Sequence, residues 1–177
     1  MTLLYRYIHK LALLLLLCLF INNTIGSVVG LSEQKEVKIP QFTYYTIEGK
    51  TFGNKDLKKN TKLIFMYFNP LCDICVSETQ NILGNYYYLQ EHNIQLVMVS
   101  PNKLGEIVVF KDKFGLDRYE NITVLHDRDD TFYKQFNAIG YPTLYLYNEE
   151  QNLITSFETE VDFEEIKVAF NKTVVKK

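Results

Sequence analysis

The sequence has few of the features that mark several common classes of protein. It carries no block of basic residues long enough to follow a phosphate backbone, and its formal net charge is −2, so nucleic acid is not expected as a partner. It has no tryptophan and only three cysteines. It does have enough apolar side chains for a packed core, 47% of all residues, which excludes disorder of the whole chain. Its 177 residues suit one domain of ordinary size with a short appendage.

The longest apolar run is also short. It covers residues 11–21 and follows a basic head that contains Arg6 and Lys10. As a helix this run would extend about 16 Å, roughly half of the ~30 Å hydrocarbon core of a membrane. The pattern is therefore more typical of an export signal than of a transmembrane helix.

The position after Gly26 fits the small-residue rule for signal cleavage. The sequence thus predicts a signal peptide over residues 1–26, with an uncleaved anchor as the alternative, a linker over 27–38 and a folded domain over 39–177. We expect an exported protein, periplasmic or attached to the cell envelope.

The cysteines are unevenly placed. Cys18 would leave with the signal, so the mature chain would hold only Cys72 and Cys75, which enclose two residues. A structural disulfide stabilises most when it closes a long loop, and this loop is very short. The pair is better explained as a redox couple that opens and closes, although a purely structural disulfide remains an alternative.

Beyond residue 39, apolar runs alternate with amphipathic segments. Strands are predicted at 62–68, 94–100, 122–125, 143–147 and 153–157. Helices are predicted at 75–91, 104–114 and 131–136, and a last helix follows Asp162. Gly84 is expected to weaken or kink the first helix and Gly140 to stop the third. This order indicates an α/β fold of three layers, with a mixed central sheet flanked by helices.

The first junction from strand to helix carries the chemistry, in the segment FNPLCDICVSE. A cysteine at the start of a helix has its thiolate favoured by free backbone N–H groups and by the helix dipole. Cys72 is predicted to hold that place and to act as the nucleophile. Cys75 returns to the same side of the first turn, where it can form a disulfide with Cys72 and resolve a mixed disulfide.

Four segments resemble motifs of the thioredoxin-like superfamily, and within it the exported TlpA/ResA-type thiol-disulfide oxidoreductases, relatives of the AhpC/TSA redoxins. These segments read IPQFTYYTIEGKTF, KLIFMYF, CDICVSE and IGYPTLYLYNEEQNLI. The resemblance implies a thioredoxin-like sandwich and an enzyme that exchanges disulfides. It also implies a cis Pro142 against the disulfide, with Tyr141 and Thr143 beside it as substrate-binding residues.

The chain departs from its relatives at two places. The tryptophan that usually precedes the motif is absent, and Met66 stands where thioredoxins bury an aspartate. Glu78 matches a glutamate that the TlpA/ResA-type proteins often carry, and it is the nearest candidate for moving the Cys75 proton. The alternative is an ordinary residue on the helix surface, because acids in the first turn of a helix need no function.

Asp73 bears on the direction of electron flow. A carboxylate beside the Cys72 thiolate opposes its charge, which favours a reductase over an oxidase. A reductase outside the cytoplasm needs a source of electrons, and the resemblance implies a membrane thiol reductant. The expected substrates are exported proteins or peptides that contain disulfides, and no cofactor is expected.

Two other functions remain as alternatives. Peroxiredoxins share the fold, but they place a threonine three residues before the peroxidatic cysteine, and counted from Cys75 that position is Cys72. A module binding copper or zinc would need His92 or His126 beside the cysteines, and neither has the short spacing of a zinc site. No metal ligands are therefore predicted.

Overall fold

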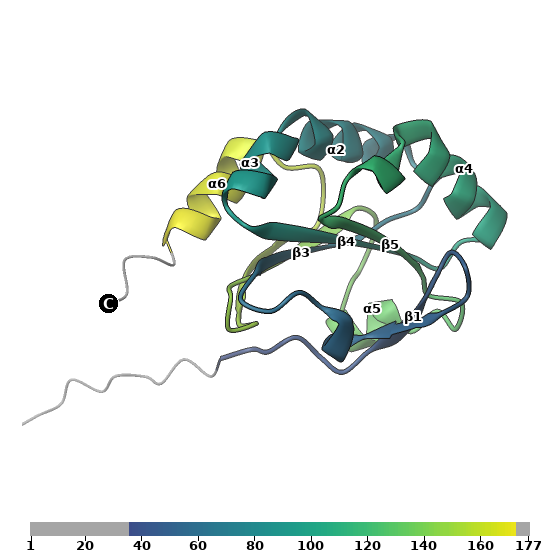
Figure 1. The fold of residues 1–177 in the computed structure, drawn as a ribbon, viewed down its shortest axis with the longest axis horizontal. Coiled ribbons are helices and arrows are strands. Elements are labelled where there is room, and N and C mark those ends of the chain that lie inside the picture. The colour runs from purple at the N-terminus through teal and green to yellow at the C-terminus, as the bar shows by residue number, and fades with distance from the viewer. Residues whose placement is uncertain (1–35, 173–177) are drawn as a thin grey trace, which may run out of the picture. The chain divides into compact units, whose positions relative to one another are not determined.

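A seven-stranded mixed sheet forms the centre of the structure, a computed structural model that describes residues 36–172. The strands are β1 (Thr43–Thr46), β2 (Thr51–Gly53), β3 (Lys62–Tyr67), β4 (Ile94–Ser100), β5 (Ile122–His126), β6 (Thr143–Tyr147) and β7 (Leu153–Phe157). Their order across the sheet is β2-β1-β5-β4-β3-β6-β7 (Figure 1). The pairs β3–β4 and β4–β5 are parallel, and every other pair is antiparallel.

Helices cover both faces of this sheet. One face carries α2 (Asp73–Gly84), α3 (Tyr86–Glu91), α4 (Leu104–Phe114) and α6 (Phe163–Lys172), and the other carries the short α5 (Phe132–Phe136) (Figure 1). Two 3-10 turns, at Asn54–Asp56 and Leu116–Arg118, lie in the connections. The prediction of a three-layer α/β sandwich around a mixed sheet is confirmed.

Strand β3 shows why the sequence forms this sandwich. Successive side chains of a strand point to opposite faces, so a strand between two helical layers is apolar at every position. Residues of β3 and the position after it alternate between two buried clusters, with Ile64, Met66 and Phe68 in one and Leu63, Phe65 and Tyr67 in the other. The central strand therefore joins the two halves of the core.

The helix predicted over 75–91 is two helices. Its first part ends at Gly84, and Asn85 separates α2 from α3. The Asn85 side chain donates to the Asn81 carbonyl at 2.9 Å, and its backbone N–H donates to the Ile82 carbonyl at 3.1 Å. The break falls beside the glycine that weakens the helix.

The prediction that Gly140 stops the helix after residue 131 is wrong. This helix, α5, ends at Phe136, and Asn137 follows it in the left-handed conformation with φ +56°. Asparagine tolerates this conformation better than most residues and so ends helices as glycine does. The other predicted elements lie within one residue of the observed ones.

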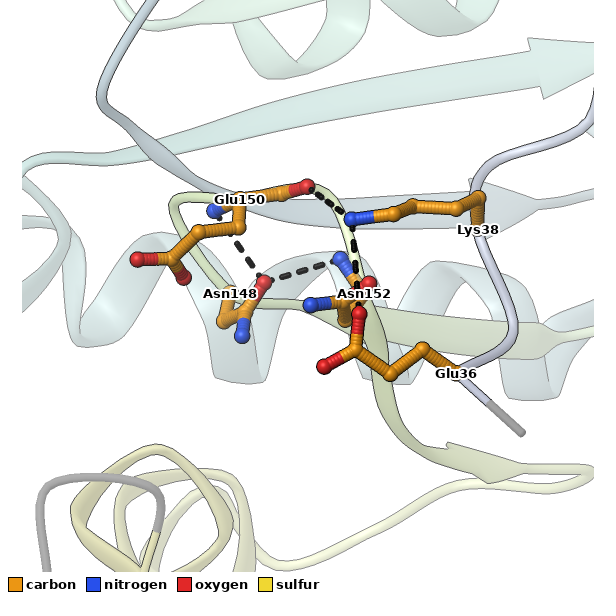
Figure 2. Close-up of polar contacts among 5 residues, drawn as sticks. All are labelled: Glu36, Lys38, Asn148, Glu150 and Asn152. Carbon is orange, nitrogen blue, oxygen red and sulfur yellow. Dashed lines mark hydrogen bonds and ion pairs between the residues drawn. The ribbon is translucent and has the colours of Figure 1, made fainter. Parts of the chain in front are cut away.

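Residues 36–39 pack against the turn between β6 and β7 (Figure 2). The Lys38 ammonium donates to the Glu150 carbonyl at 3.0 Å, and the Leu153 N–H donates to the Val37 carbonyl at 2.7 Å. Among the described residues, hydrogen bonds to the rest of the domain are thus present from Val37 onward, two residues before Ile39. The predicted signal and most of the predicted linker lie outside the described residues. Within residues 36–172, no helix has both the length and the apolar character needed to cross a membrane.

Candidate active site

The loop between β3 and α2 presents the first cysteine. After the Phe68 N–H donates to the Val99 carbonyl at 3.0 Å, the chain leaves the sheet. The Asn69 side-chain oxygen then accepts from the Leu71 N–H at 2.9 Å, and the Asn69 carbonyl accepts from the Cys72 N–H at 3.1 Å. These local bonds fold the loop into a turn that places Cys72 at the start of the helix.

The two cysteines differ in exposure. Cys72 is the N-cap of α2, in an extended conformation, and its side chain is partly exposed. Cys75 lies one turn further along and is fully buried. Both are free thiols in this structure. The pair therefore has one sulfur that a substrate can reach and one that is shielded from solvent.

Burial also changes the chemistry of the second thiol. Loss of solvent raises the pKa of Cys75 to about 12, and contact with Cys72 and the charge of Glu78 act in the same direction. The Asn69 N–H opposes them, because it donates to the Cys75 sulfur at 3.5 Å. Burial thus favours the thiol form of Cys75 over the thiolate.

Glu78 lies one turn beyond Cys75 and is fully buried, so the interpretation as an ordinary surface residue is wrong. Its Oε2 atom accepts from the Val161 N–H at 3.1 Å, while Oε1 has no hydrogen-bond partner among the described residues. Burial is the main cause that raises the pKa of Glu78 to about 7, and the charge of Glu160 adds to it. A carboxyl group with this pKa exchanges protons near neutral pH.

The start of β6 brings the third part of the site into place. In the pairing of β3 with β6, Thr143 lies opposite Tyr67, the last residue before the cysteine loop. Tyr141 and Pro142 therefore lie where the chain leaves β3. The peptide bond between them is cis, as expected from the resemblance.

Side-chain hydrogen bonds stabilise the conformation of the segment around Pro142. The Thr143 hydroxyl donates to the Gly140 carbonyl at 2.8 Å, and the Tyr141 hydroxyl donates to the Tyr67 hydroxyl at 3.1 Å. Cys72 and Tyr141 pack against the same core cluster. The cysteine pair, Glu78 and the segment around Pro142 thus gather at the ends of β3 and the beginnings of α2 and β6.

Sequence reasoning missed the role of two residues here. Asn69 forms hydrogen bonds within the loop and contacts the Cys75 sulfur. The sequence pattern that could have indicated this role is the Asn-Pro pair directly after a buried strand. Tyr67 is 3% exposed and donates to Asp130 at 3.4 Å. Nothing in its position within an apolar run distinguished it from a core aromatic. Met66, in place of the aspartate of thioredoxins, is an ordinary buried core residue.

The residues considered for other functions have other surroundings. His92 caps α3 and stacks on Tyr88 with ring centroids 3.8 Å apart, and His126 ends β5 opposite Tyr45. Among residues 36–172 no group of three or more His, Cys, Asp and Glu side chains is arranged to hold a metal ion. A peroxidase would need an arginine to hold the peroxide, and Arg128, one of two arginines beyond residue 26, instead lies over the Tyr45 ring at 3.3 Å.

Comparison with known proteins decides the family. The model of the AhpC/TSA family matches residues 36–156, more than half of the chain. The chain belongs to the AhpC/TSA family. Its membership and its thioredoxin-like fold make it an oxidoreductase, as predicted. No curated protein matches it in a sequence search.

Several solved structures share the fold of this AhpC/TSA family member. A secreted disulfide oxidoreductase of Mycobacterium tuberculosis, homologous to E. coli DsbE, has 20% identity and a TM-score of 0.61, with 73% of this chain and 93% of that chain covered. The thioredoxin domain of a thiol-disulfide oxidoreductase from Bacteroides vulgatus has 17% identity and a TM-score of 0.63, with 78% and 96% covered.

A third structure of this kind is a thiol:disulfide interchange protein of the thioredoxin family from Chlorobium tepidum. It has 19% identity and a TM-score of 0.62, with 78% of this chain and 99% of that chain covered. At these identities the likeness establishes the thioredoxin-like fold of the AhpC/TSA family member and nothing finer.

Proposed function

We propose that this protein is an exported thiol-disulfide oxidoreductase that reduces disulfides through Cys72 and Cys75. The observation that carries the proposal is the asymmetry of the pair. One thiol is accessible at the start of a helix, and the other is buried one turn along beside a buried carboxyl group. A structural disulfide has no need of such an arrangement.

The reaction proceeds in two exchanges. The Cys72 thiolate attacks one sulfur of the substrate disulfide, the substrate S–S bond breaks, and its other sulfur leaves as a thiolate that takes a proton from water. Cys75 then loses its proton and attacks the Cys72 sulfur, which breaks the mixed disulfide and releases the second substrate sulfur as a thiolate. Two electrons pass to the substrate, and the enzyme retains a Cys72–Cys75 disulfide.

Glu78 takes the proton of Cys75 in the second exchange. The two groups lie one helical turn apart on the same side of α2, and the charge of Glu78 is felt at the Cys75 thiol. A pKa of about 7 makes the carboxylate available near neutral pH. Glu78 also holds the Val161 N–H, so it has a structural task as well.

Pro142 and its neighbours bind the substrate chain. The backbone next to Pro142 lies beside the cysteine loop, where an extended peptide can pair with it as an added strand. Asp73 is exposed in the first turn of α2 and opposes negative charge on Cys72, which favours the reducing direction. A membrane thiol reductant outside the cytoplasm would return the two electrons, and the predicted signal over residues 1–26 would deliver the protein to it.

The test is the reduction potential of the cysteine pair together with two single variants. A value near or below the roughly −270 mV of thioredoxin supports a reductase, and one near the roughly −120 mV of DsbA reverses the direction. Cys72→Ser is expected to abolish turnover and Cys75→Ser to accumulate mixed disulfides, while Gln80→Ala, at an exposed position of α2, serves as the control. Normal multiple turnover by Cys75→Ser contradicts the two-cysteine scheme.

A further inference from the structure

A pocket adjoins the segment around Pro142. It has a volume of about 270 Å³, and its lining includes Tyr67, Asp130, Tyr133, Ile139 and Tyr141. Gly140 and Tyr141, which line it, directly precede the cis Pro142. Tyr133 lies in α5, which covers the face of the sheet opposite α2 (Figure 1), so the pocket extends toward that face.

The polar groups of this pocket form a chain that ends in a carboxylate. The Tyr141 hydroxyl donates to the Tyr67 hydroxyl at 3.1 Å, and the Tyr67 hydroxyl donates to Asp130 Oδ1 at 3.4 Å. The Asp130 backbone is fixed in the left-handed conformation with φ +48°, and its N–H donates to the Asp127 carbonyl at 3.1 Å. The carboxylate is exposed but has a defined position at the edge of the pocket.

Asp130 has no cationic partner within the described part of the chain. No Lys, Arg or His nitrogen there lies within 4.0 Å of its carboxylate. The nearest cations in sequence are engaged elsewhere: Arg128 contacts Asp129 at 3.9 Å and lies over the Tyr45 ring, and Lys134 lies 5.3 Å from the centre of the Tyr133 ring. The pocket thus offers an unpaired negative charge to an incoming group.

The other walls of the pocket suit a long cationic side chain. Tyr141 contributes an aromatic wall, and a cation is attracted to the face of an aromatic ring, whereas the Tyr133 ring already has the Lys134 ammonium 5.3 Å from its centre. Ile139 is 78% exposed and offers apolar surface for a methylene stem. Lysine and arginine have both an apolar stem and a charged head, so they match a pocket of aromatic and apolar walls with a carboxylate.

The place of the pocket sets the position of such a residue in the substrate. Gly140 and Tyr141 line the pocket and directly precede Pro142. A peptide that pairs beside Pro142 with its disulfide at Cys72 would therefore bring side chains next to its cysteine to the pocket. We propose that this pocket selects substrates that carry a lysine or arginine within two residues of the disulfide cysteine; the inference rests on the function proposed above.

The test uses the full chain and short peptides whose single cysteine carries a disulfide to 2-mercaptoethanol. Lysine, glutamine or glutamate is placed at each position from −2 to +2, and the second-order rate constant of reduction is measured. At the best position, lysine is expected to be about fivefold to tenfold faster than glutamine, because an exposed ion pair and a cation–π contact each add a modest amount. Glutamate is expected to be slower than glutamine.

Two variants distinguish binding of the lysine in this pocket from a general attraction to exposed negative charge. Asp130→Asn is expected to bring the lysine and glutamine peptides to equal rates. Asp129→Asn removes a neighbouring exposed charge that does not line the pocket, and the lysine preference is expected to persist. Loss of the preference in both variants, or in neither, overturns the inference.

A binding measurement keeps this test independent of the redox step. Peptides with serine in place of cysteine are titrated into the protein by calorimetry, and the lysine peptide is expected to bind about fivefold more tightly than the glutamine peptide, except with Asp130→Asn. Equal binding of the lysine and glutamine peptides contradicts the proposed selectivity of the pocket. Preferential binding of the lysine peptide without reduction of any disulfide peptide contradicts the proposed function but supports the selectivity of the pocket.

Discussion

The buried Glu78 makes the stability of the reduced protein depend on pH in a way that one substitution removes. In the folded protein burial raises its pKa from 4.5 to about 7. Between these two pH values the native state binds more protons than the unfolded state, so the free energy of unfolding falls as pH rises. A shift of about 2.5 units corresponds to roughly 3 kcal/mol at about 1.4 kcal/mol per unit.

The assay is urea unfolding of the reduced protein and of Glu78→Gln at intervals from pH 4 to pH 8. Glutamine keeps an oxygen for the Val161 N–H but does not ionise. Because all other groups titrate in both proteins, the wild-type value minus the variant value isolates Glu78. This difference is expected to fall by up to about 3 kcal/mol between pH 4.5 and pH 8, with most of the change complete by pH 7.

The control is Glu165→Gln, which removes an exposed carboxylate on α6. The difference between its free energy of unfolding and that of the wild type should stay the same from pH 4 to pH 8. If the free energies of unfolding of the wild type and Glu78→Gln also differ by the same amount at every pH, the Glu78 carboxyl does not have a raised pKa. The proposal that Glu78 accepts the Cys75 proton would then be contradicted.

Two further predictions concern the thiols and the core. At pH 8 the single thiol of Cys72→Ser should react with iodoacetamide at least ~100-fold more slowly than that of Cys75→Ser, because burial raises the Cys75 pKa to about 12; mass spectrometry over time measures both rates, and equal rates contradict the asymmetry. Phe132→Ala should lower the free energy of unfolding by about 3–5 kcal/mol, since the Phe132 ring is fully buried and stacks on Phe136 at 4.1 Å. Tyr87→Ala, at a position 75% exposed, should change it by less than ~0.5 kcal/mol in the same urea assay, and similar losses in the two variants would refute the packing argument.

Much of the fold could be predicted because its central strands are buried on both faces. The runs that form β4 and β6 are mostly apolar, and their ends coincide with a proline or a polar turn. The helix boundaries were predicted less well, and both differences fall at asparagines. Asn85 separates α2 from α3 directly after Gly84, where the sequence predicted only a weakened or kinked helix, and Asn137 rather than Gly140 ends α5, in the left-handed conformation.

The local segments of the candidate site could be predicted from the sequence, but the contacts between distant segments could not. A Cys-x-x-Cys pair at a helix start and a proline before a strand are local patterns. The burial of Glu78 depends on Val161, 83 residues away, and the position of Tyr67 depends on Asp130, 63 residues away. Such contacts join segments that are far apart in the sequence, and no spacing within a single segment predicts them.

The pairing of β3 with β6 has a consequence for the growing chain. Leu63 lies opposite Tyr147, so the central strand gains its second neighbour only after residue 147 has been made. Leu144 and Leu146 of β6 belong to the same cluster that buries Cys75. During synthesis Cys75 therefore lacks part of its cover until β6 joins the sheet, and the full difference in exposure between the two cysteines is reached only then.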